Sequence, residues 1–353
     1  MTCPTASSLV LITGATGHVG FRVLVHALSV GYSVRAAVRS SEKAKTIRSH
    51  PLIKGLNPGS RLTFIIVPDL CEPNAYDEAV HGVGYVIHIA SPLMSNRIPP
   101  PDDQDAFFIK PAVRGTLNIL EAANKSRTVR RVVITSSITA LIPFSEVNGS
   151  QRCLSWISPT DRTPFVSGPY ANEFEAYAAS KVAALYEAEA WIATHNPDFD
   201  VVHLHPSFVA GRNDLALHTR EVLKGTNTIV LSIALGKQFD YSTMGATVHL
   251  EDVARVHVQA LDEAVPGNSS YILSQNTEWD EVTEIVSRNF PDTIKKGMLP
   301  NSGSALTHLM FIDSGLTEEI FGFQHMGLEE QVKSVVGHYL EVRTKQNKSS
   351  VRR

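Results

Sequence analysis

The run Thr13-Gly14-Ala15-Thr16-Gly17-His18-Val19-Gly20 is the feature that most constrains how this chain can fold. It follows a continuous apolar segment, 9–13, and precedes a segment, 19–30, whose apolar residues recur at helical spacing. In that setting the first glycine permits a tight turn, the second lets backbone approach a pyrophosphate, and the third lets the helix pack closely on the strand. The helix N-terminus adds amide donors for phosphate. The run therefore predicts a dinucleotide-binding turn rather than an ordinary strand-to-helix turn, with cofactor contacts from Gly14, Thr16, Gly17, His18, Val19 and Gly20.

The remainder of the first half alternates short apolar runs with helix-like segments. Strands are predicted at 32–38, 62–67, 85–90, 131–136 and 199–204, and helices at 41–49, 74–80, 106–124 and 173–195. Strands that are buried on both faces and joined by crossover helices form a parallel sheet. The expected fold is therefore α/β, with a Rossmann-type, doubly wound parallel sheet.

The alternation loosens after Gly211, which indicates a smaller C-terminal lobe that binds substrate. Over 353 residues we predict a dinucleotide-binding domain that carries the catalytic groups at 1–210 and a substrate-binding lobe at 211–340. Within the lobe, 247–275 is expected to return to the sheet. Residues 341–353 are polar and basic, and we expect them to fray.

Charge and hydropathy exclude several classes of partner. The chain has 32 Lys and Arg residues against 35 acidic residues, so its net charge of −3 offers no attraction for nucleic acid or an anionic membrane. No apolar stretch approaches the ~20 residues that a membrane-spanning helix needs. Residues 1–8 lack the pattern of a secretion signal, so a cytoplasmic protein is expected.

The cysteines and histidines do not indicate a metal site. Cys3, Cys71 and Cys153 form no CxxC pair, so we expect reduced thiols. His203 and His205 alternate on a strand and share a face, but no third ligand stands at a suitable spacing. We therefore expect these two histidines to pack or to form hydrogen bonds.

The second strand ends without the carboxylate that would hold the ribose 2′-hydroxyl of NAD. It reads Arg35 to Arg39, and Arg39 can pair with a 2′-phosphate, to which Lys43 would add charge. NADP(H) is therefore favoured, the alternative being a solvated basic face. Asp69 and Leu70 follow the third strand, where a carboxylate could accept from the adenine amino group or cap a helix.

Three further residues make a proton-transfer site. Ser137 follows the strand at 131–136, and Tyr177 and Lys181 stand four residues apart on a predicted helix, so that they share a face. An ammonium nearby lowers the pKa of a phenol, which ordinarily lies near ~10. Tyr177 could then protonate a carbonyl oxygen while Ser137 holds the same oxygen. Chance alone produces such Tyr-Lys pairs; the position at the carboxyl edge of a nucleotide-binding sheet favours catalysis.

Together these residues resemble the extended short-chain dehydrogenase/reductases. The match rests on the glycine run, on TSS at 135–137 and on YAASK at 177–181. HIASP at 88–92, KPAVRGTLNIL at 110–120 and HPSFVAG at 205–211 are similar to the branch with dihydroflavonol reductase, cinnamoyl-CoA reductase and the fungal NADPH-dependent aldehyde and ketone reductases. The resemblance spans roughly residues 8–275.

The resemblance implies roles for several positions. Ser137 would be the catalytic serine, Tyr177 the acid, and Lys181 would also bind the nicotinamide ribose. Asn118 would have a supporting role. The cofactor cleft would include Ala90 and Ser91, and its nicotinamide side Pro206, Ser207 and Val209. The branch's acidic-Ser-Trp stretch reads Cys153 to Trp156 here, in a loop that would touch substrate, although we expect Trp156 and Trp191 themselves to be buried.

We therefore expect an NADPH-dependent reductase that converts a ketone or aldehyde to the alcohol. Loops at the carboxyl edge of the sheet should form the substrate pocket, with an apolar wall from Leu93, Met94, Ile138, Phe174 and Val209, where core packing is an equal explanation for Ile138 and Val209. Such a wall suits an aromatic, aliphatic or polyketide-like carbonyl compound. The alternatives are an epimerase, dehydratase or hydroxysteroid-type dehydrogenase, non-redox chemistry at the same site, and a regulatory protein that senses dinucleotide without turning it over. A monomer or homodimer is expected.

Overall fold

The computed structural model describes residues 9–94 and 102–351, with side chains described through residue 348. Cys3, the first eight residues and part of the stretch that follows Pro92 lie outside the described residues. The chain divides into two compact units. The first consists of Met1–Phe144, Pro159–His205 and Ala254–Tyr271, and the second of Ser145–Ser158, Pro206–Val253 and Ile272–Arg353.

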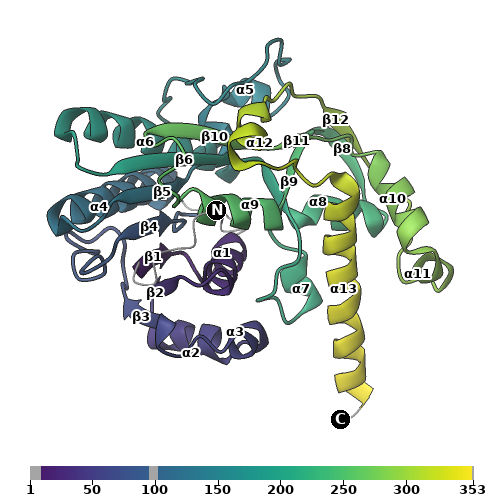
Figure 1. Ribbon diagram of the computed structural model, residues 1–353. Helices are drawn as coiled ribbons and strands as arrows, with labels where there is room; N and C mark the ends of the chain where they lie inside the picture. Colours follow the sequence, from purple (N-terminus) through teal and green to yellow (C-terminus); the bar gives the residue numbers. More distant parts are fainter. Residues whose placement is uncertain (1–8, 95–101, 352–353) are drawn as a thin grey trace. The chain divides into compact units, whose positions relative to one another are not determined.

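The first unit is built on a seven-stranded sheet with the order β10-β6-β5-β4-β1-β2-β3 (Figure 1). The neighbouring strands from β6 to β3 pair in parallel; Ile12 of β1, for example, lies between Ala36 of β2 and Ile87 of β4. The sheet confirms the predicted Rossmann-type fold. Its strands are β1 (Leu9–Thr13), β2 (Ser33–Val38), β3 (Leu62–Ile66), β4 (Tyr85–His88), β5 (Arg131–Thr135), β6 (Asp200–Pro206) and β10 (Ser269–Leu273).

Helices cover both faces of this sheet (Figure 1). One face carries α4 (Lys110–Ser126) and α6 (Glu173–His195), which pack against each other, and the other carries α1 (His18–Ser29) with α3 (Pro51–Leu56). Leu11, Ile119 and Val201 belong to the apolar core between the sheet and α4 and α6. The other short elements of this unit are α2 (Ser41–Ser49), η1 (Gly59–Arg61), η2 (Asp105–Ile109) and η3 (Ile138–Ala140). The helices α5 (Phe144–Val147) and α9 (Leu250–Gln259) contain residues of both units.

Two helix predictions in this unit need correction. Residues 74–80 form successive turns instead of a helix, and Asn74, at their start, takes a left-handed conformation with a φ of 62° that a helical residue does not adopt. The helix predicted at 106–124 begins with the wider turn η2 and becomes regular at Lys110. Pro111 has no N–H to complete the preceding α-helical turn, which accounts for the irregular start.

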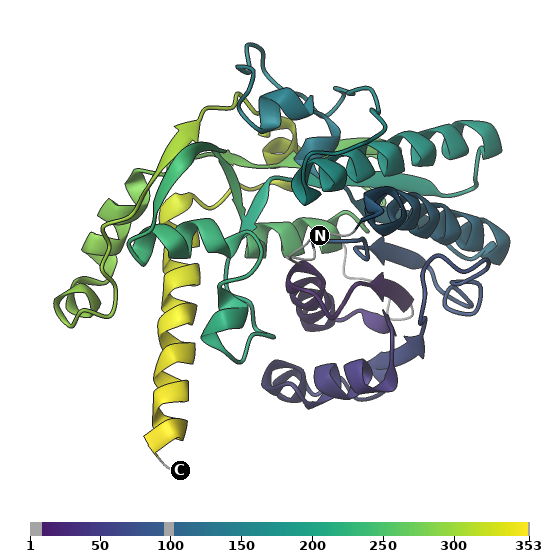
Figure 2. The ribbon, with the colours of Figure 1, turned by 180° about the vertical axis from the view of Figure 1, so that it is seen from behind.

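The second unit contains two small sheets and most of the remaining helices (Figure 2). Helices α8 and α10 contact the long α13, and their shared core includes Val230, Trp279 and Val335. The sheets are β11-β9-β7 and β12-β8. The elements are β7 (Phe208–Ala210), α7 (Thr219–Val222), α8 (Asn227–Ala234), β8 (Gln238–Met244), β9 (Ala246–His249), β11 (Gln275–Asn276), α10 (Glu281–Asn289), α11 (Pro291–Lys295), β12 (Ser304–His308), α12 (Gly315–Phe321) and α13 (Leu328–Val351).

The limits of the units differ from the predicted limits at 210 and 247–275. The chain leaves the first unit after His205 and returns to it at Ala254, and residues 145–158 belong to the second unit. Within the segment expected to return to the large sheet, 247–275, β10 does so beside β6, whereas β9 pairs with β7 and β11 instead. Pairing partners are set by tertiary contacts, which the apolar pattern of a short strand does not encode.

Two further predictions are corrected in the second unit. Residues 341–351 continue α13 where a frayed tail was expected, because Val342 is buried and Arg343 Nη1 donates to the Met298 carbonyl at 2.7 Å. Trp156 is 64 % exposed, whereas it was expected to be buried. Its ring lies against Phe311, with ring centroids 5.9 Å apart, on the surface of the unit.

Within the described residues, none of the helices is both long and apolar enough to cross a membrane.

Burial lowers the pKa values of three histidines in the first unit, His88, His203 and His205. Burial lowers the pKa of His203 to about 4 and that of His205 well below its ordinary value. His205 forms hydrogen bonds through both ring nitrogens, to the Ser137 carbonyl and the Ser270 hydroxyl. Neither ring nitrogen of His203 has a partner among the described residues. Both side chains are thus neutral, and the unfolded chain binds protons more readily than the folded one below pH ~6.5.

We therefore expect the protein to lose stability as the pH falls from 7.5 to 5. Replacing His203 by Phe removes one group that must stay neutral in the folded protein. Between pH ~7.5 and ~5 the free energy of unfolding of this variant should therefore fall by about 2 kcal/mol less than that of the wild type. Urea denaturation at the two pH values measures this. His81→Phe, at an exposed histidine, is the control and should keep the wild-type pH dependence. An unchanged pH dependence in His203→Phe would contradict this explanation.

Candidate active site

The glycine run forms a turn that has no room for side chains. Gly14 has a φ of 75°, and a Cβ there would lie 2.8 Å from the Ala90 nitrogen. A Cβ on Gly20 would lie 2.1 Å from the Gly14 carbonyl oxygen, and Gly17 N–H donates to that oxygen at 2.9 Å. Among the described residues no side chain caps α1, so its first N–H groups remain donors for an anion. This exposed backbone fits the pyrophosphate of a dinucleotide.

Thr13 joins this turn to the end of β4. Its hydroxyl oxygen accepts from the backbone N–H groups of Ile89 and Ala90, both at 3.1 Å. Because both lone pairs are then used, the hydroxyl proton is left to donate to His88 Nδ1, 3.0 Å away. Burial and the Lys181 ammonium lower the pKa of His88 to about 3, so the ring is a neutral acceptor. Sequence reasoning quoted His88 only as part of a motif and assigned Thr13 no function.

Arg39 and Lys43 lie where the sequence places a 2′-phosphate. Arg39 follows β2 and is exposed. Ser40 caps α2, and its side chain accepts from the Lys43 N–H at 3.5 Å. The exposed Lys43 side chain therefore starts from the first turn of that helix, four residues from Arg39. Two cations next to a helix N-terminus make a surface suited to a phosphate.

Asp69 and Leu70 lie in the loop after β3, which α4 contacts through Asn118. Asp69 Oδ1 accepts from Cys71 N–H at 2.8 Å, so one carboxylate oxygen stabilises a turn rather than a helix. Asn118 Nδ2 donates to the carbonyls of Leu70 and Glu72, at 2.7 and 2.9 Å. Gly115 makes room for Leu70, whose Cδ1 would lie 2.4 Å from an added Cβ. Asn118 therefore supports the loop that follows β3.

Ser137, Tyr177 and Lys181 come together in the first unit. Ser137 follows β5 at the carboxyl edge of the sheet, and Tyr177 and Lys181 lie one turn apart on α6, which Asn172 caps. Lys181 Nζ lies 5.7 Å from the centre of the Tyr177 ring and donates to the Thr135 carbonyl at 3.3 Å. Ser136, the neighbouring hydroxyl, is buried and its Oγ has no partner among the described residues.

The electrostatics of this cluster differ from the expectation for Tyr177. Burial raises its pKa, and the group that opposes this is Ser137, through a hydrogen bond, rather than Lys181. Lys181 is itself buried, which lowers its pKa to about 8. Without a bound cofactor, the Tyr177 side chain is therefore a protonated phenol, and Lys181 gains and loses a proton near neutral pH.

The positions expected around the nicotinamide and substrate are distributed over both units. Pro206, Ser207 and Val209 belong to the second unit, where Ser207 N–H donates to the Leu273 carbonyl at 3.0 Å. In the first unit Ala90 and Ser91 are partly exposed after β4, and Leu93 and Met94 are exposed. Phe174 contacts Phe144, with ring centroids 5.6 Å apart. Ile138 is 1 % exposed and Val209 8 %, which favours packing for both.

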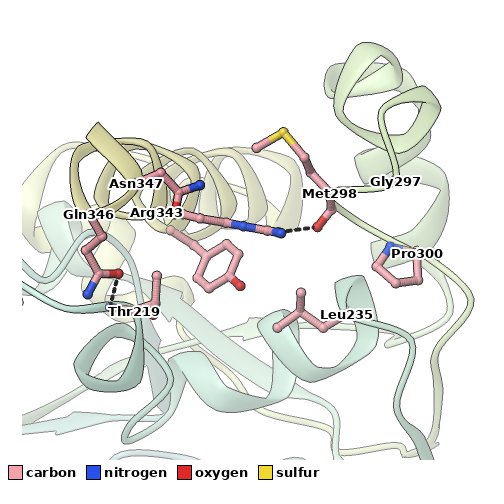
Figure 3. Close-up of a pocket in the computed structure, with 9 residues that line it drawn as sticks. Thr219, Leu235, Gly297, Met298, Pro300, Arg343, Gln346 and Asn347 are labelled. Carbon is pink, nitrogen blue, oxygen red and sulfur yellow. Dashed lines mark hydrogen bonds between the residues drawn. The ribbon is translucent and has the colours of Figure 1, made fainter. Parts of the chain in front are cut away.

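A cavity of about 480 Å³ in the second unit does not include any of these residues (Figure 3). Arg343 extends across it to the Met298 carbonyl, and the Gln346 side chain accepts from the Thr219 N–H (Figure 3). It is lined by Thr219, Leu235, Gly297, Met298, Pro300, Tyr339, Arg343, Gln346 and Asn347.

Comparison with known proteins agrees with this geometry. Residues 10–273 match the model of the NAD dependent epimerase/dehydratase family, and the chain belongs to that family. This confirms the resemblance to the extended short-chain dehydrogenase/reductases.

Curated relatives match over nearly the whole chain. Ketoreductase CTB6 of Cercospora nicotianae is 42 % identical, with 96 % of each chain covered. NAD-dependent epimerase/dehydratase ALT6 of Alternaria alternata is 36 % identical, over 92 % of this chain and 96 % of the relative. Among solved structures, Gre2 of Candida albicans in complex with NADPH is 25 % identical with a TM-score of 0.79, over 95 % of this chain and 99 % of that one.

Proposed function

We propose that this protein is an NADPH-dependent reductase that converts a ketone or aldehyde to the alcohol. The observation that carries the proposal is the cluster of the buried Ser137 and Lys181 with the partly exposed Tyr177, in the unit that also holds the glycine turn. His88 lies between the two, since it accepts from Thr13 at the turn, and burial together with the Lys181 ammonium lowers its pKa. The relative named a ketoreductase supports this reaction class.

The residues divide the proton chemistry among them. When bound, NADPH supplies the hydride. Tyr177 donates its phenolic proton to the carbonyl oxygen, and Ser137 donates a hydrogen bond to the same oxygen. Lys181, whose pKa of about 8 is close to neutrality, can return a proton to Tyr177 and contact the nicotinamide ribose. Ser137 and Lys181 are buried and Tyr177 is only partly exposed, so little water competes for these interactions.

The cofactor is proposed to be NADPH because Arg39 and Lys43 place two cations beside the N-terminus of α2. The Gre2 structure, solved with NADPH, supports the same choice. We assign the pyrophosphate to the turn of Gly14, Thr16, Gly17, His18, Val19 and Gly20, and the adenine side to Asp69 and Leu70. Ala90, Ser91, Pro206, Ser207 and Val209 remain the proposed nicotinamide contacts.

The substrate is proposed to be a hydrophobic carbonyl compound of small to medium size. The exposed Leu93 and Met94 and the partly exposed Phe174 are the best candidates for its apolar contacts, since Ile138 and Val209 are occupied by packing. A monomer or homodimer is the proposed state.

An epimerase or dehydratase is the second candidate function. It is favoured by the family model and by the relative named an epimerase/dehydratase. Such an enzyme would use the same cluster for transient oxidation. A regulatory protein that only senses dinucleotide would not need Tyr177 and Lys181 at one site.

The cofactor assignment predicts the effect of changing Arg39. NADPH should bind at least about tenfold more tightly than NADH, a difference of ~1.4 kcal/mol, and Arg39→Asp should reverse this order because a carboxylate repels the 2′-phosphate. Dissociation constants follow from the quenching of protein fluorescence. Lys45→Asp makes the same change of charge on α2 and should keep the preference for NADPH. Equal affinities of the wild type for the two cofactors would contradict the assignment.

The acid role predicts that Tyr177→Phe lowers turnover by about 10² to 10⁴ and leaves NADPH affinity almost unchanged, because only the transferable proton is lost. NADPH oxidation against a panel of ketones and aldehydes measures the rate. Tyr186→Phe, at an exposed position of the same helix, should retain wild-type turnover. A Tyr177→Phe enzyme as fast as the wild type would require a different acid.

The substrate class predicts the outcome of a competition assay. Hydrophobic ketones should inhibit turnover of a reporter aldehyde better than UDP-sugars do, because a sugar nucleotide needs more polar and basic partners than the proposed contacts offer. If UDP-sugars are the stronger inhibitors, the epimerase or dehydratase function is favoured instead.

A further inference from the structure

The hydroxyl of Ser137 accepts two hydrogen bonds from one neighbour. Ser137 is the N-cap of the one-turn helix η3, and the backbone N–H of Thr139 donates to its Oγ at 3.3 Å. The Thr139 hydroxyl donates to the same oxygen at 3.0 Å. Both side chains are buried, at 7 % and 3 % exposure, so water does not substitute for these bonds.

These two bonds decide what the Ser137 hydroxyl can still do. A hydroxyl has two acceptor lone pairs and one proton to donate. Since Thr139 occupies both lone pairs, the proton of Ser137 is the part left for another partner. The lowering effect of Ser137 on the pKa of Tyr177 agrees with donation, because a donor stabilises the phenolate.

The backbone of Ser137 is held as firmly. Its carbonyl accepts from Ala140 N–H at 3.0 Å and from His205 Nδ1 at 3.4 Å. Its φ of −159° and ψ of 153° are ordinary extended values, so no strain competes with this arrangement. Only rotation of the side chain is left, and the branched Thr139 side chain, itself restricted at χ1, limits that rotation.

We propose that Thr139 is a positioning residue that makes the Ser137 hydroxyl a donor toward the oxygen of the carbonyl substrate. The inference rests on the proposed function, in which Ser137 contacts that oxygen. Without the Thr139 hydroxyl, one lone pair of Ser137 becomes free. The Ser137 proton can then rotate toward other acceptors, and a smaller fraction of molecules is ready to stabilise the reacting oxygen.

The test is a double-mutant cycle on kcat with NADPH and the ketone that the panel identifies. Thr139→Val keeps the shape and the backbone N–H but removes the hydroxyl, and it should lower kcat by about two- to tenfold. Thr139→Ser restores the hydroxyl and should stay close to the wild type. In the Ser137→Ala background, Thr139→Val should have no further effect, because the group on which it acts is absent. Thr116→Val removes a buried hydroxyl that donates to the Ala112 carbonyl within α4, and it should leave kcat unchanged.

A second measurement is independent of substrate. Ultraviolet absorbance reports phenolate formation, and the transition that is missing in Tyr177→Phe belongs to Tyr177. Thr139→Val should move this transition to higher pH, and Thr139→Ser should not. NADPH affinity and the thermal midpoint of each variant are measured alongside. If Thr139→Val unfolds, Thr139→Ala and Thr139→Ser form the pair to compare.

The outcomes separate the two hypotheses. Equal losses in wild-type and Ser137→Ala backgrounds, or equal losses for Val and Ser at position 139, would overturn the positioning role and leave the proposed function intact. The same holds if Ser137→Ala is impaired while Thr139→Val keeps wild-type kcat. If Ser137→Ala itself turns over at the wild-type rate, Ser137 does not act on the substrate, and both its assigned role and this inference fail.

Discussion

The close approach of backbone at the glycine turn is the constraint on which the rest of the site depends. Gly20 lies so near the Gly14 carbonyl that no Cβ fits, and Gly14 lies equally close to the backbone at Ala90. These contacts fix where α1 begins relative to β1 and β4. The amide donors of α1 and the end of β4 are therefore presented as one rigid surface, which a flexible loop could not provide.

Two buried hydroxyls follow the same physical rule. Thr13 accepts two backbone N–H groups and so donates to His88, and Ser137 accepts twice from Thr139 and so has its proton free to donate. In a buried environment each unmet donor or acceptor is costly, so filling the acceptor positions determines the direction of the remaining bond. The fold thereby decides whether a hydroxyl donates or accepts the remaining hydrogen bond, which the residue type alone leaves undetermined.

Much of the fold was predictable from the sequence, since the strands of the large sheet are rich in apolar residues and the glycine run marks the first turn. The errors in the prediction occurred where the conformation or burial of a segment differs from what its local pattern indicates. Residues 74–80 have helical spacing but form turns around Asn74, Trp156 is apolar but lies exposed against Phe311, and residues 341–351 are polar but are kept helical by contacts with the rest of the second unit.

The sequence by itself indicated the family and the parallel sheet and supplied the candidates for the reacting groups, because the apolar period, the glycine spacing and the Tyr-Lys spacing on one helix are local properties. Only the tertiary structure decided how those groups are tuned. Burial raises the pKa of Tyr177 and lowers that of Lys181 to about 8. The donor role proposed for Ser137 depends on the hydrogen bonds that its hydroxyl accepts from Thr139. Desolvation and hydrogen-bond direction depend on what surrounds a group in space, and a linear pattern does not specify that.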